Sequence, residues 1–408
     1  MQIKIPYGKK SLQVEIPDEN ILDIVKPKEL IPPDSAENIL KEAIKNPLGT
    51  DKISEFVNNN DSIAIVVDDY TRPCPNELLL KPILEELKKI GVSDSNIKII
   101  IATGTHAPPN FEKIKETVGD KIARNYNVVS NDVKNSEYVS IGNSKFGNKI
   151  EVLKEYIESD IKIILGDIVY HYFAGYGGTR KSILPGICSQ DTIQNNHAML
   201  FDEKSKTGSL KGNKISEEMF EALYKAGCDF CLNVVLNSDK KIIGAWAGKA
   251  DLVMNEGVKL IDSMYKREIT KKADIVLVAS NGYPQDINLY QSMKALHLAT
   301  KGVKKGGVII FVAECIEGVG SDLYLNWLKK YKNSDEIEKE LSKNFILGAH
   351  KAYYHRKATE NNSIFLLSSL DNRLCKEVFS FEPINNLDEG IKKSYIKIIV
   401  MPILITSD

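Results

Sequence analysis

Two histidines that directly follow apolar segments are the side chains best suited to acid–base chemistry. His106 follows the β-branched run 97–102, and His171 follows the run 161–169. Such runs predict buried strands. The carboxyl ends of parallel strands meet at one edge of a sheet, so we expect both imidazoles at the same rim. They could cap loops, hold a metal or act as paired general bases. No HExxH or 2-His-1-carboxylate spacing occurs, which disfavours a metal held by protein ligands alone.

A glycine-rich segment, residues 171–186, begins at the second of these histidines. Its glycines are Gly175, Gly177 and Gly178, and its cations are Arg180 and Lys181. We expect the glycines to bring backbone N–H groups close to a ligand and the cations to add positive charge, which favours a phosphorylated or anionic molecule. The spacing matches neither a P-loop nor the dinucleotide-binding fingerprint.

Further polar residues follow predicted strands in both halves of the chain. Asp69 and Arg72 follow the run 62–67, in a loop that two prolines stiffen. They could form a local ion pair, or Arg72 could bind a substrate carboxylate. Gln291 and Lys294 are three residues apart near the start of a helix predicted at about 287–300, so they share one face. The alternative is that Lys294 is an ordinary solvent-exposed lysine with no role in binding.

The amino-acid composition is typical of a globular protein. The chain has 408 residues, 43% hydrophobic and 27% charged, with a formal net charge of −1. No basic excess predicts binding to nucleic acid or to a membrane surface. The amino terminus lacks an apolar signal segment, so we expect a cytoplasmic protein. The six cysteines are then expected to be free thiols, and Cys228 and Cys231, despite their CxxC spacing, to belong to an apolar strand.

The order of elements predicts an α/β fold with two domains and mainly parallel sheets. A hairpin is expected at residues 2–16 and a helix at 35–46. Strands at 62–67, 97–102 and 161–169 alternate with helices at 76–90, where Asn76 is expected to cap, and at 110–118. A second series begins at 274–279 and ends with a helix near 386–393 and a strand at 396–401. We place the boundary near 268, which gives domains 1–268 and 269–408 whose strand ends face a shared cleft.

Five motifs in this order resemble the nickel-dependent lactate racemase family, from the amino-terminal hairpin to near the carboxyl terminus. They are Asp69-x-Thr-Arg72-Pro, Ala102-Thr-Gly-Thr-His106, the segment 171–186, Asn196-His197 and Tyr290-Gln291-x-x-Lys294. The resemblance implies a 2-hydroxyacid racemase and a nickel pincer nucleotide, a pyridinium mononucleotide with two sulfur donors and a carbon–nickel bond. Cofactor-synthesis proteins would be partners of the enzyme. The larger domain would carry the histidines and the covalent attachment of this cofactor, and the smaller domain would close the cleft.

The resemblance also implies a role for each matching residue. Lys181 would carry the thioamide tether, His197 would bind nickel, and His106 and His171 would be the acid/base pair. The remaining residues would orient substrate, bases and cofactor: Asp69, Arg72, Gly175, Gly178, Arg180, Tyr290, Gln291 and Lys294.

The chemistry of a 2-hydroxy acid agrees with such a site. Its Cα proton is very weakly acidic, so transfer of hydride to an electrophilic cofactor is easier than deprotonation. The two enantiomers present their hydroxyl groups to opposite sides, which calls for two bases. Thr105 and Ala107 differ from the aromatic and basic residues of lactate-specific members, and His350 stands where some members have Trp. Malate or a longer hydroxy acid therefore remains an alternative substrate to lactate. A nicotinamide-dependent oxidoreductase and a non-catalytic phosphate-ligand binding protein are the other hypotheses.

Overall fold

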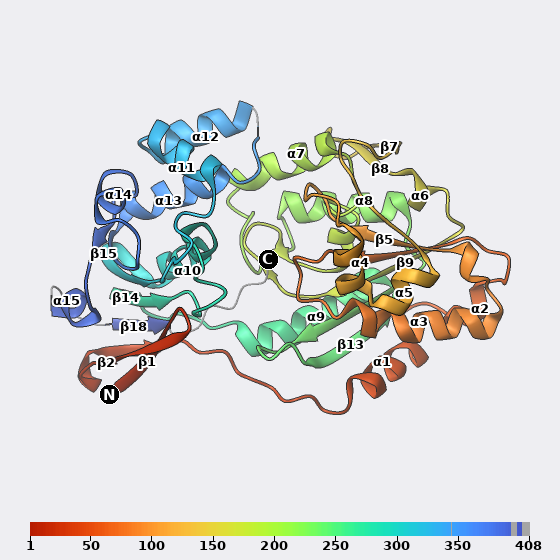
Figure 1. Ribbon diagram of the computed structural model, residues 1–408, viewed down its shortest axis with the longest axis horizontal. Helices are drawn as coiled ribbons and strands as arrows, with labels where there is room; N and C mark the ends of the chain where they lie inside the picture. The colour runs from red at the N-terminus through yellow and green to blue at the C-terminus, as the bar shows by residue number, and fades with distance from the viewer. Residues whose placement is uncertain (344, 393–397, 402–408) are drawn as a thin grey trace. The chain divides into compact units, whose positions relative to one another are not determined.

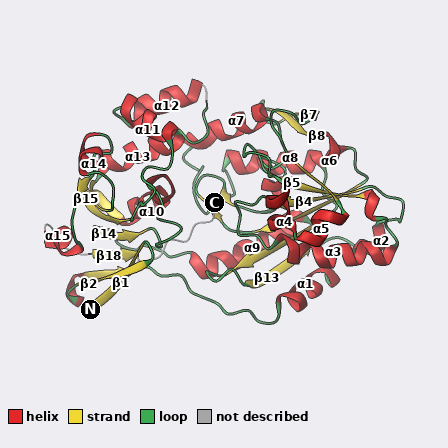
Figure 2. Ribbon diagram, in the orientation of Figure 1, coloured by secondary structure: helices red, strands yellow, loops and turns green. Residues whose placement is uncertain are grey.

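The computed structural model describes residues 1–343, 345–392 and 398–401. The chain divides into two compact units. The large unit is Lys28–Met264, and the small unit combines Met1–Pro27 with the described residues from Tyr265 onward. Figures 1 and 2 show strands flanked by helices in each unit, as predicted for an α/β protein with two domains. No helix in the described ranges is long and apolar enough to span a bilayer.

A six-stranded sheet of order β13-β12-β9-β4-β5-β6 forms the centre of the large unit. Its strands are β4 (Ile63–Asp68), β5 (Ile97–Ala102), β6 (Asn127–Ser130), β9 (Ile161–Asp167), β12 (Phe230–Leu236) and β13 (Ile242–Gly248). All pairs are parallel except β12 with β13. Residues Ile63–Val67 of β4 are all buried, because helices cover both faces of a parallel sheet. One face packs into a cluster with Leu79, Leu80 and Ile83.

The helices and short strands of the large unit surround this sheet. The helices are α1 (Ala36–Lys45), α2 (Ile53–Phe56), α3 (Asn76–Ile90), α4 (Phe111–Val118), α5 (Asp120–Asn125), α6 (Lys154–Ile157), α7 (Gln190–Ala198), α8 (Lys214–Ala226) and α9 (Ala250–Tyr265). Two small antiparallel pairs complete it: β7 (Tyr138–Asn143) with β8 (Lys149–Leu153), and β10 (Tyr170–His171) with β11 (Gly175–Tyr176).

The small unit has a fully parallel sheet of order β17-β16-β15-β14-β18-β3. Its strands are β3 (Ile21–Ile24), β14 (Ala273–Ala279), β15 (Val303–Val312), β16 (Ser363–Leu367), β17 (Glu382–Pro383) and β18 (Ile398–Met401). Its helices are α10 (Leu289–Gly302), α11 (Asp322–Lys330), α12 (Ser334–Lys343), α13 (His350–Asn361), α14 (Asn372–Glu377) and α15 (Leu387–Lys392).

The amino-terminal hairpin belongs to the small unit, whereas the expected domain 1–268 included it. Its strands are β1 (Gln2–Tyr7) and β2 (Lys10–Glu15). Ile3, Ile5 and Val14 pack into the same hydrophobic cluster as buried residues of β14 and β18. The hairpin tip is held by a hydrogen bond of 2.7 Å from the Gly8 N–H to the buried Asp286 carboxylate. Burial of an apolar strand face explains this placement, and β3 then joins the edge of the same sheet.

Most predicted elements agree with the structure to within a few residues, and one capping prediction is wrong. Asn76 is the first residue of α3, not its N-cap, and its Nδ2 donates to the Asp68 carbonyl at 2.8 Å. The strand β3 was not predicted because a four-residue sequence carries little periodic signal. Residues 393, 396 and 397 of the last predicted helix and strand lie outside the described ranges.

Candidate active site

His106 and Asp69 form a close pair at the carboxyl edge of the large unit's sheet. His106 Nδ1 lies 2.6 Å from Asp69 Oδ2, and Thr71 donates to Asp69 Oδ1 through its backbone N–H and its hydroxyl. The Asp69 side chain is 2% exposed, while that of His106 is 40% exposed. Burial raises the pKa of Asp69, but the hydrogen bonds from His106 and Thr71 and nearby positive charge outweigh it, so the pKa is lowered. A carboxylate at Nδ1 leaves the lone pair of a neutral His106 at Nε2.

Asn131 fixes the turn that carries His106. Its Nδ2 donates to the Gly104 carbonyl at 3.0 Å and to the Cys188 carbonyl at 3.1 Å. The Gly104 N–H also donates to the Gly186 carbonyl at 2.9 Å. These bonds join the loop after β5 to the end of the glycine-rich segment. Asn131 follows β6, and the sequence analysis gave it no role.

His171 lies in the short β10–β11 hairpin, where it is buried with 7% exposure. Its ring stacks on Tyr172 and meets the edge of Phe173. The Ala174 N–H donates to Nδ1 at 3.1 Å, which makes Nδ1 an acceptor and assigns the proton of a neutral ring to Nε2. The two histidines are therefore set in opposite tautomers. Strands β5, β4 and β9 are adjacent in the sheet, which confirms that both follow strands ending at one edge.

Lys181 and His197 are close enough for their charges to interact. Lys181 lies in the 3₁₀ turn Thr179–Ser182, and His197 lies near the end of α7 with 5% exposure. Burial and the Lys181 charge together lower the pKa of His197 to about 3, against the opposing effect of a hydrogen bond to the backbone at Ile193. His197 is thus a neutral imidazole, the form that binds metals.

Gly175 and Gly178 pack against protein on the side where a side chain would stand, and their predicted approach to a ligand stays a prediction. A Cβ on Gly175 would lie 2.1 Å from the Ser209 carbonyl oxygen. A Cβ on Gly178 would lie 2.7 Å from the Asp167 carbonyl oxygen. Both residues have φ near +80°, a region that favours glycine. The glycines therefore allow the segment to fold tightly over the ends of the strands.

Arg180 is turned into the protein, which corrects the expectation that its charge faces a ligand. It is fully buried, and its Nη2 donates to the Ala174 and Tyr176 carbonyls at 2.9 and 3.0 Å. The guanidinium also lies over the Phe220 ring at 4.9 Å. Burial lowers the pKa of Arg180 to about 9. Arg180 thus holds the hairpin that carries His171.

Arg72 does not form the local ion pair that the sequence left open. Asp69 binds His106 and Thr71 instead, and within the described ranges no side-chain hydrogen bond or ion pair involves Arg72. Its charge opposes the burial that raises the pKa of Asp68 and contributes to the lowered pKa of Asp69, so it lies near both. A half-buried guanidinium in this state can bind an anion without first breaking a protein contact.

In the small unit, Tyr290, Gln291 and Lys294 lie in the first turns of α10, which follows β14. Asn288 caps this helix, accepting from the Gln291 N–H at 2.9 Å. Lys351 of α13 lies over the Tyr290 ring at 3.8 Å and donates to its carbonyl at 3.0 Å. The predicted shared face of Gln291 and Lys294 follows from their helical spacing.

Comparisons with known proteins cover both units. Residues 7–208 match the family model of the lactate racemase N-terminal domain, and residues 269–395 match that of the lactate racemase C-terminal domain. A lactate racemase of Thermoanaerobacterium thermosaccharolyticum is 37% identical over 340 residues, 82% of this chain and 79% of the relative. The chain belongs to the lactate racemase family. A second lactate racemase, from Lactiplantibacillus plantarum, is 31% identical over 403 residues, 96% of this chain and 94% of the relative.

Solved structures support the lactate racemase fold along the whole chain. The lactate racemase apoprotein of T. thermosaccharolyticum has a TM-score of 0.91 and 34% identity, and the match covers 100% of this chain and 99% of that one. A Thermotoga maritima protein shares the fold with a TM-score of 0.63 at 17% identity, over 90% of this chain and 95% of that one.

Within this lactate racemase fold, a buried carboxylate that the sequence analysis missed anchors the helix of His197. Glu218 of α8 is fully buried and accepts from Ser144 Oγ at 2.6 Å, from Asn148 Nδ2 at 3.0 Å and from Asn196 Nδ2 at 2.9 Å. Asn148 Nδ2 also donates to the Thr192 carbonyl of α7. The signal in the sequence is a glutamate on the apolar face of an amphipathic helix, where an ionised side chain needs partners.

Proposed function

We propose that this chain is a lactate racemase, an isomerase that interconverts D- and L-lactate through a 2-keto acid. Family membership supports the reaction type. The observation that carries the assignment of the site is the bond of 2.6 Å between His106 and the buried Asp69. It gives one imidazole a basic Nε2 and a carboxylate to stabilise the cation that forms when the ring accepts a proton.

We propose His106 and His171 as the acid/base pair. His106 Nε2 accepts the hydroxyl proton of one enantiomer while Asp69 balances the new charge. His171 would serve the opposite enantiomer from the tautomer that carries the proton on Nδ1, so its ring must first release the Ala174 N–H. Arg72, which forms no side-chain hydrogen bond or ion pair with the described residues, would bind the substrate carboxylate.

We propose that the cofactor is a nickel pincer nucleotide. Two observations fit it: His197 is neutral, and the Lys181 charge reaches it. Lys181 would carry the thioamide tether and His197 would be the protein ligand of nickel, since an imidazole with soft sulfur donors suits this metal. When bound, the cofactor would supply a reversible hydride acceptor. The cofactor-synthesis proteins would then be obligatory partners.

The small unit would complete the site. We propose that Tyr290, Gln291 and Lys294 bind the substrate and the cofactor. Their position in the first turns of a helix at the carboxyl end of β14 supports this, because ligands of α/β folds bind at that edge. Thr105 and His350 would shape the pocket, so malate or a longer 2-hydroxy acid is the alternative substrate.

Chiral analysis of a panel of 2-hydroxy acids tests the proposal. The chain would be co-expressed with the cofactor-synthesis enzymes and incubated with single enantiomers of lactate, malate and a longer-chain hydroxy acid carrying deuterium at Cα. We expect racemisation of lactate with the deuterium retained, because hydride returns to the same carbon. Loss of deuterium to water would contradict hydride transfer, and racemisation of another acid alone would contradict lactate as the substrate.

A further inference from the structure

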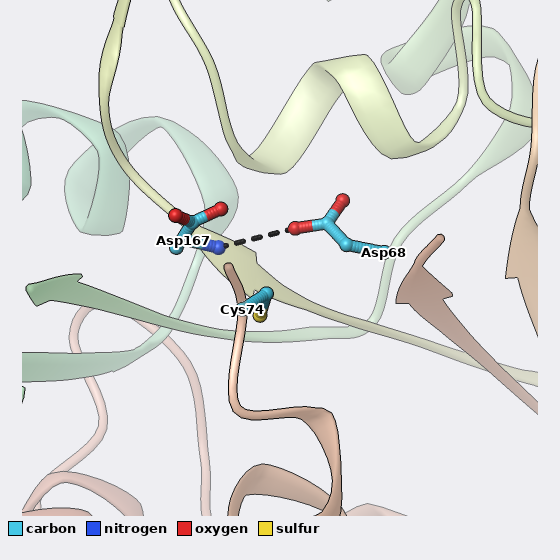
Figure 3. A group of neighbouring side chains, drawn as sticks. All are labelled: Asp68, Cys74 and Asp167. Atoms are coloured by element: carbon cyan, nitrogen blue, oxygen red, sulfur yellow. Dashed lines mark hydrogen bonds between the residues drawn. The ribbon is translucent and has the colours of Figure 1, made fainter. Parts of the chain in front are cut away.

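Asp68 and Asp167 bring two carboxyl groups together at the ends of adjacent strands. Asp68 ends β4 and Asp167 ends β9, while Cys74 approaches from the loop after β4 (Figure 3). One ligand atom from each of the three residues lies within 4.8 Å of the other two. The Asp167 N–H donates to Asp68 Oδ2 at 3.3 Å. The cluster belongs to none of the roles assigned above.

The surroundings cannot balance two negative charges here. Asp167 is 3% exposed, and its Oδ2 is out of contact with solvent and bonded to no donor among the described residues. Among the described residues, the titratable groups that act on the pair include Arg72, Asp69, Cys74 and Cys231. Arg72 is the cation of this set, and within the described ranges it forms no ion pair within 4.0 Å. A buried and a half-buried carboxylate at this distance repel strongly, so one of them keeps a proton.

Asp167 is the residue that keeps it. Burial and the negative charge of Asp68 raise the pKa of Asp167 to about 8. The pKa of Asp68 is raised as well, because burial outweighs the Arg72 charge and the hydrogen bond from the Asp167 N–H. That N–H bond to Asp68 Oδ2 favours the charged form at Asp68, so we assign Asp68 as the carboxylate and Asp167 as the acid.

The pair lies between the loop that carries Asp69 and the segment that carries His171 and Lys181. Asp68 precedes Asp69, which holds His106. The Asp167 carbonyl lies against Gly178, and the Thr179 N–H beside it is held by Asn233 Oδ1 at 2.9 Å. A change of spacing between Asp68 and Asp167 would therefore move both the Asp69 loop and the segment that leads to Lys181.

We propose that Asp68 and Asp167 share one proton and act as positioning residues that set the spacing of these two loops. The function given to the loops rests on the proposed racemase activity. The shared proton itself does not, so it can be tested on the chain without cofactor.

Thermal unfolding of the wild type, Asp167→Asn and Asp167→Leu between about pH 5 and pH 9 tests the shared proton. The Asn amide can donate to Asp68 at every pH, whereas Leu cannot. Because the folded pKa of Asp167 is raised, the wild type should lose stability relative to Asp167→Asn as pH rises to about 8, by up to about tenfold in the unfolding equilibrium constant per pH unit. Parallel curves for these two proteins would overturn the proposal.

Two further measurements, the first on the wild type alone, keep the test decisive if the Asp167 variants fail to fold. Difference infrared spectroscopy should show one carboxylic acid band that disappears above about pH 8, and its absence would overturn the proposal. Elemental analysis after incubation with Zn²⁺, Ni²⁺ or Mn²⁺ should show no metal that Asp68→Asn removes. Such a metal would mean that the cluster is a cation site instead.

The racemisation rate of the cofactor-loaded enzyme tests whether the Asp68–Asp167 pair affects the reaction. The wild type should lose racemisation rate on the alkaline side of about pH 8, and Asp167→Asn should shift or abolish this limb. Asp167→Leu should lower the rate at least tenfold at pH 7. An alkaline limb identical in wild type and Asp167→Asn would refute the positioning role, while failure of all proteins to racemise lactate would refute only the proposed function.

Discussion

His106 is bound through Nδ1 to the buried carboxylate of Asp69 at 2.6 Å, so its Nε2 is the basic nitrogen. Asp69→Asn removes the charge that stabilises the protonated ring. A general base contributes about 10²- to 10⁴-fold, so we expect the racemisation rate to fall at least about tenfold. Thr71→Val is the matched control, because it removes the Thr71 hydroxyl from Asp69 but keeps the carboxylate. A larger loss in Thr71→Val than in Asp69→Asn would contradict the assignment.

The lowered pKa of Asp69 also predicts its behaviour in acid. The folded pKa lies below the unfolded value, so the stability that Asp69 contributes is present at neutral pH and is lost as pH falls through the folded pKa. The difference in unfolding temperature between wild type and Asp69→Asn should shrink only below about pH 4. A difference that already disappears near pH 6 would show that Asp69 is not held as a carboxylate.

Arg180 should behave as part of the core. Arg180→Met leaves the Ala174 and Tyr176 carbonyls without their donor, which costs about 1–3 kcal/mol for each buried group left unpaired. Arg180→Lys should recover little, because an ammonium cannot reproduce the fork of the guanidinium. Chemical denaturation measures both changes. If the cation faced a ligand instead, stability would survive and only cofactor retention would fall.

Gly175 and Gly147 offer a matched pair of substitutions. Both have positive φ, +81° and +84°, but only Gly175 has an atom in the way, the Ser209 oxygen at 2.1 Å from an added Cβ. Alanine at either position incurs a backbone cost of about 1–2 kcal/mol. We therefore expect Gly175→Ala to be clearly less stable than Gly147→Ala in thermal unfolding. Equal losses would show that the contact with Ser209 can relax freely.

Glu218 should control the helix that carries His197. Glu218→Gln places an NH₂ group against Asn148 and Asn196, which both donate, so we expect a loss of about 1–3 kcal/mol. Nickel content after co-expression with the cofactor-synthesis enzymes should fall together with this loss of folding stability. Glu256→Gln is the control, since among the described residues the Glu256 carboxylate pairs with exposed Lys259 alone. Full nickel occupancy in Glu218→Gln would mean that α7 does not need this anchor.

The sequence predicted elements well where hydrophobic periodicity is strong and side-chain direction less well. Strand β5 and the ends of β4 and β9 followed from β-branched runs, and so did the shared edge of Asp69, His106 and His171. The direction of Arg180 did not follow, because a cation beside glycines looks the same whether it faces a ligand or two carbonyls. The partners of Glu218 and Asp167 come from distant parts of the chain, and one sequence does not show which residues meet.

The central claim is that His106 and His171 are bases whereas His197 binds the metal. The most direct test is nickel content together with racemisation rate in His106→Ala, His171→Ala and His197→Ala, each loaded in the same way. We predict that the first two keep nickel and lose at least about 10²-fold in rate in both directions, and that His197→Ala loses nickel. Loss of nickel in the first two, with retention in His197→Ala, would show that ligand and bases have been assigned the wrong way round.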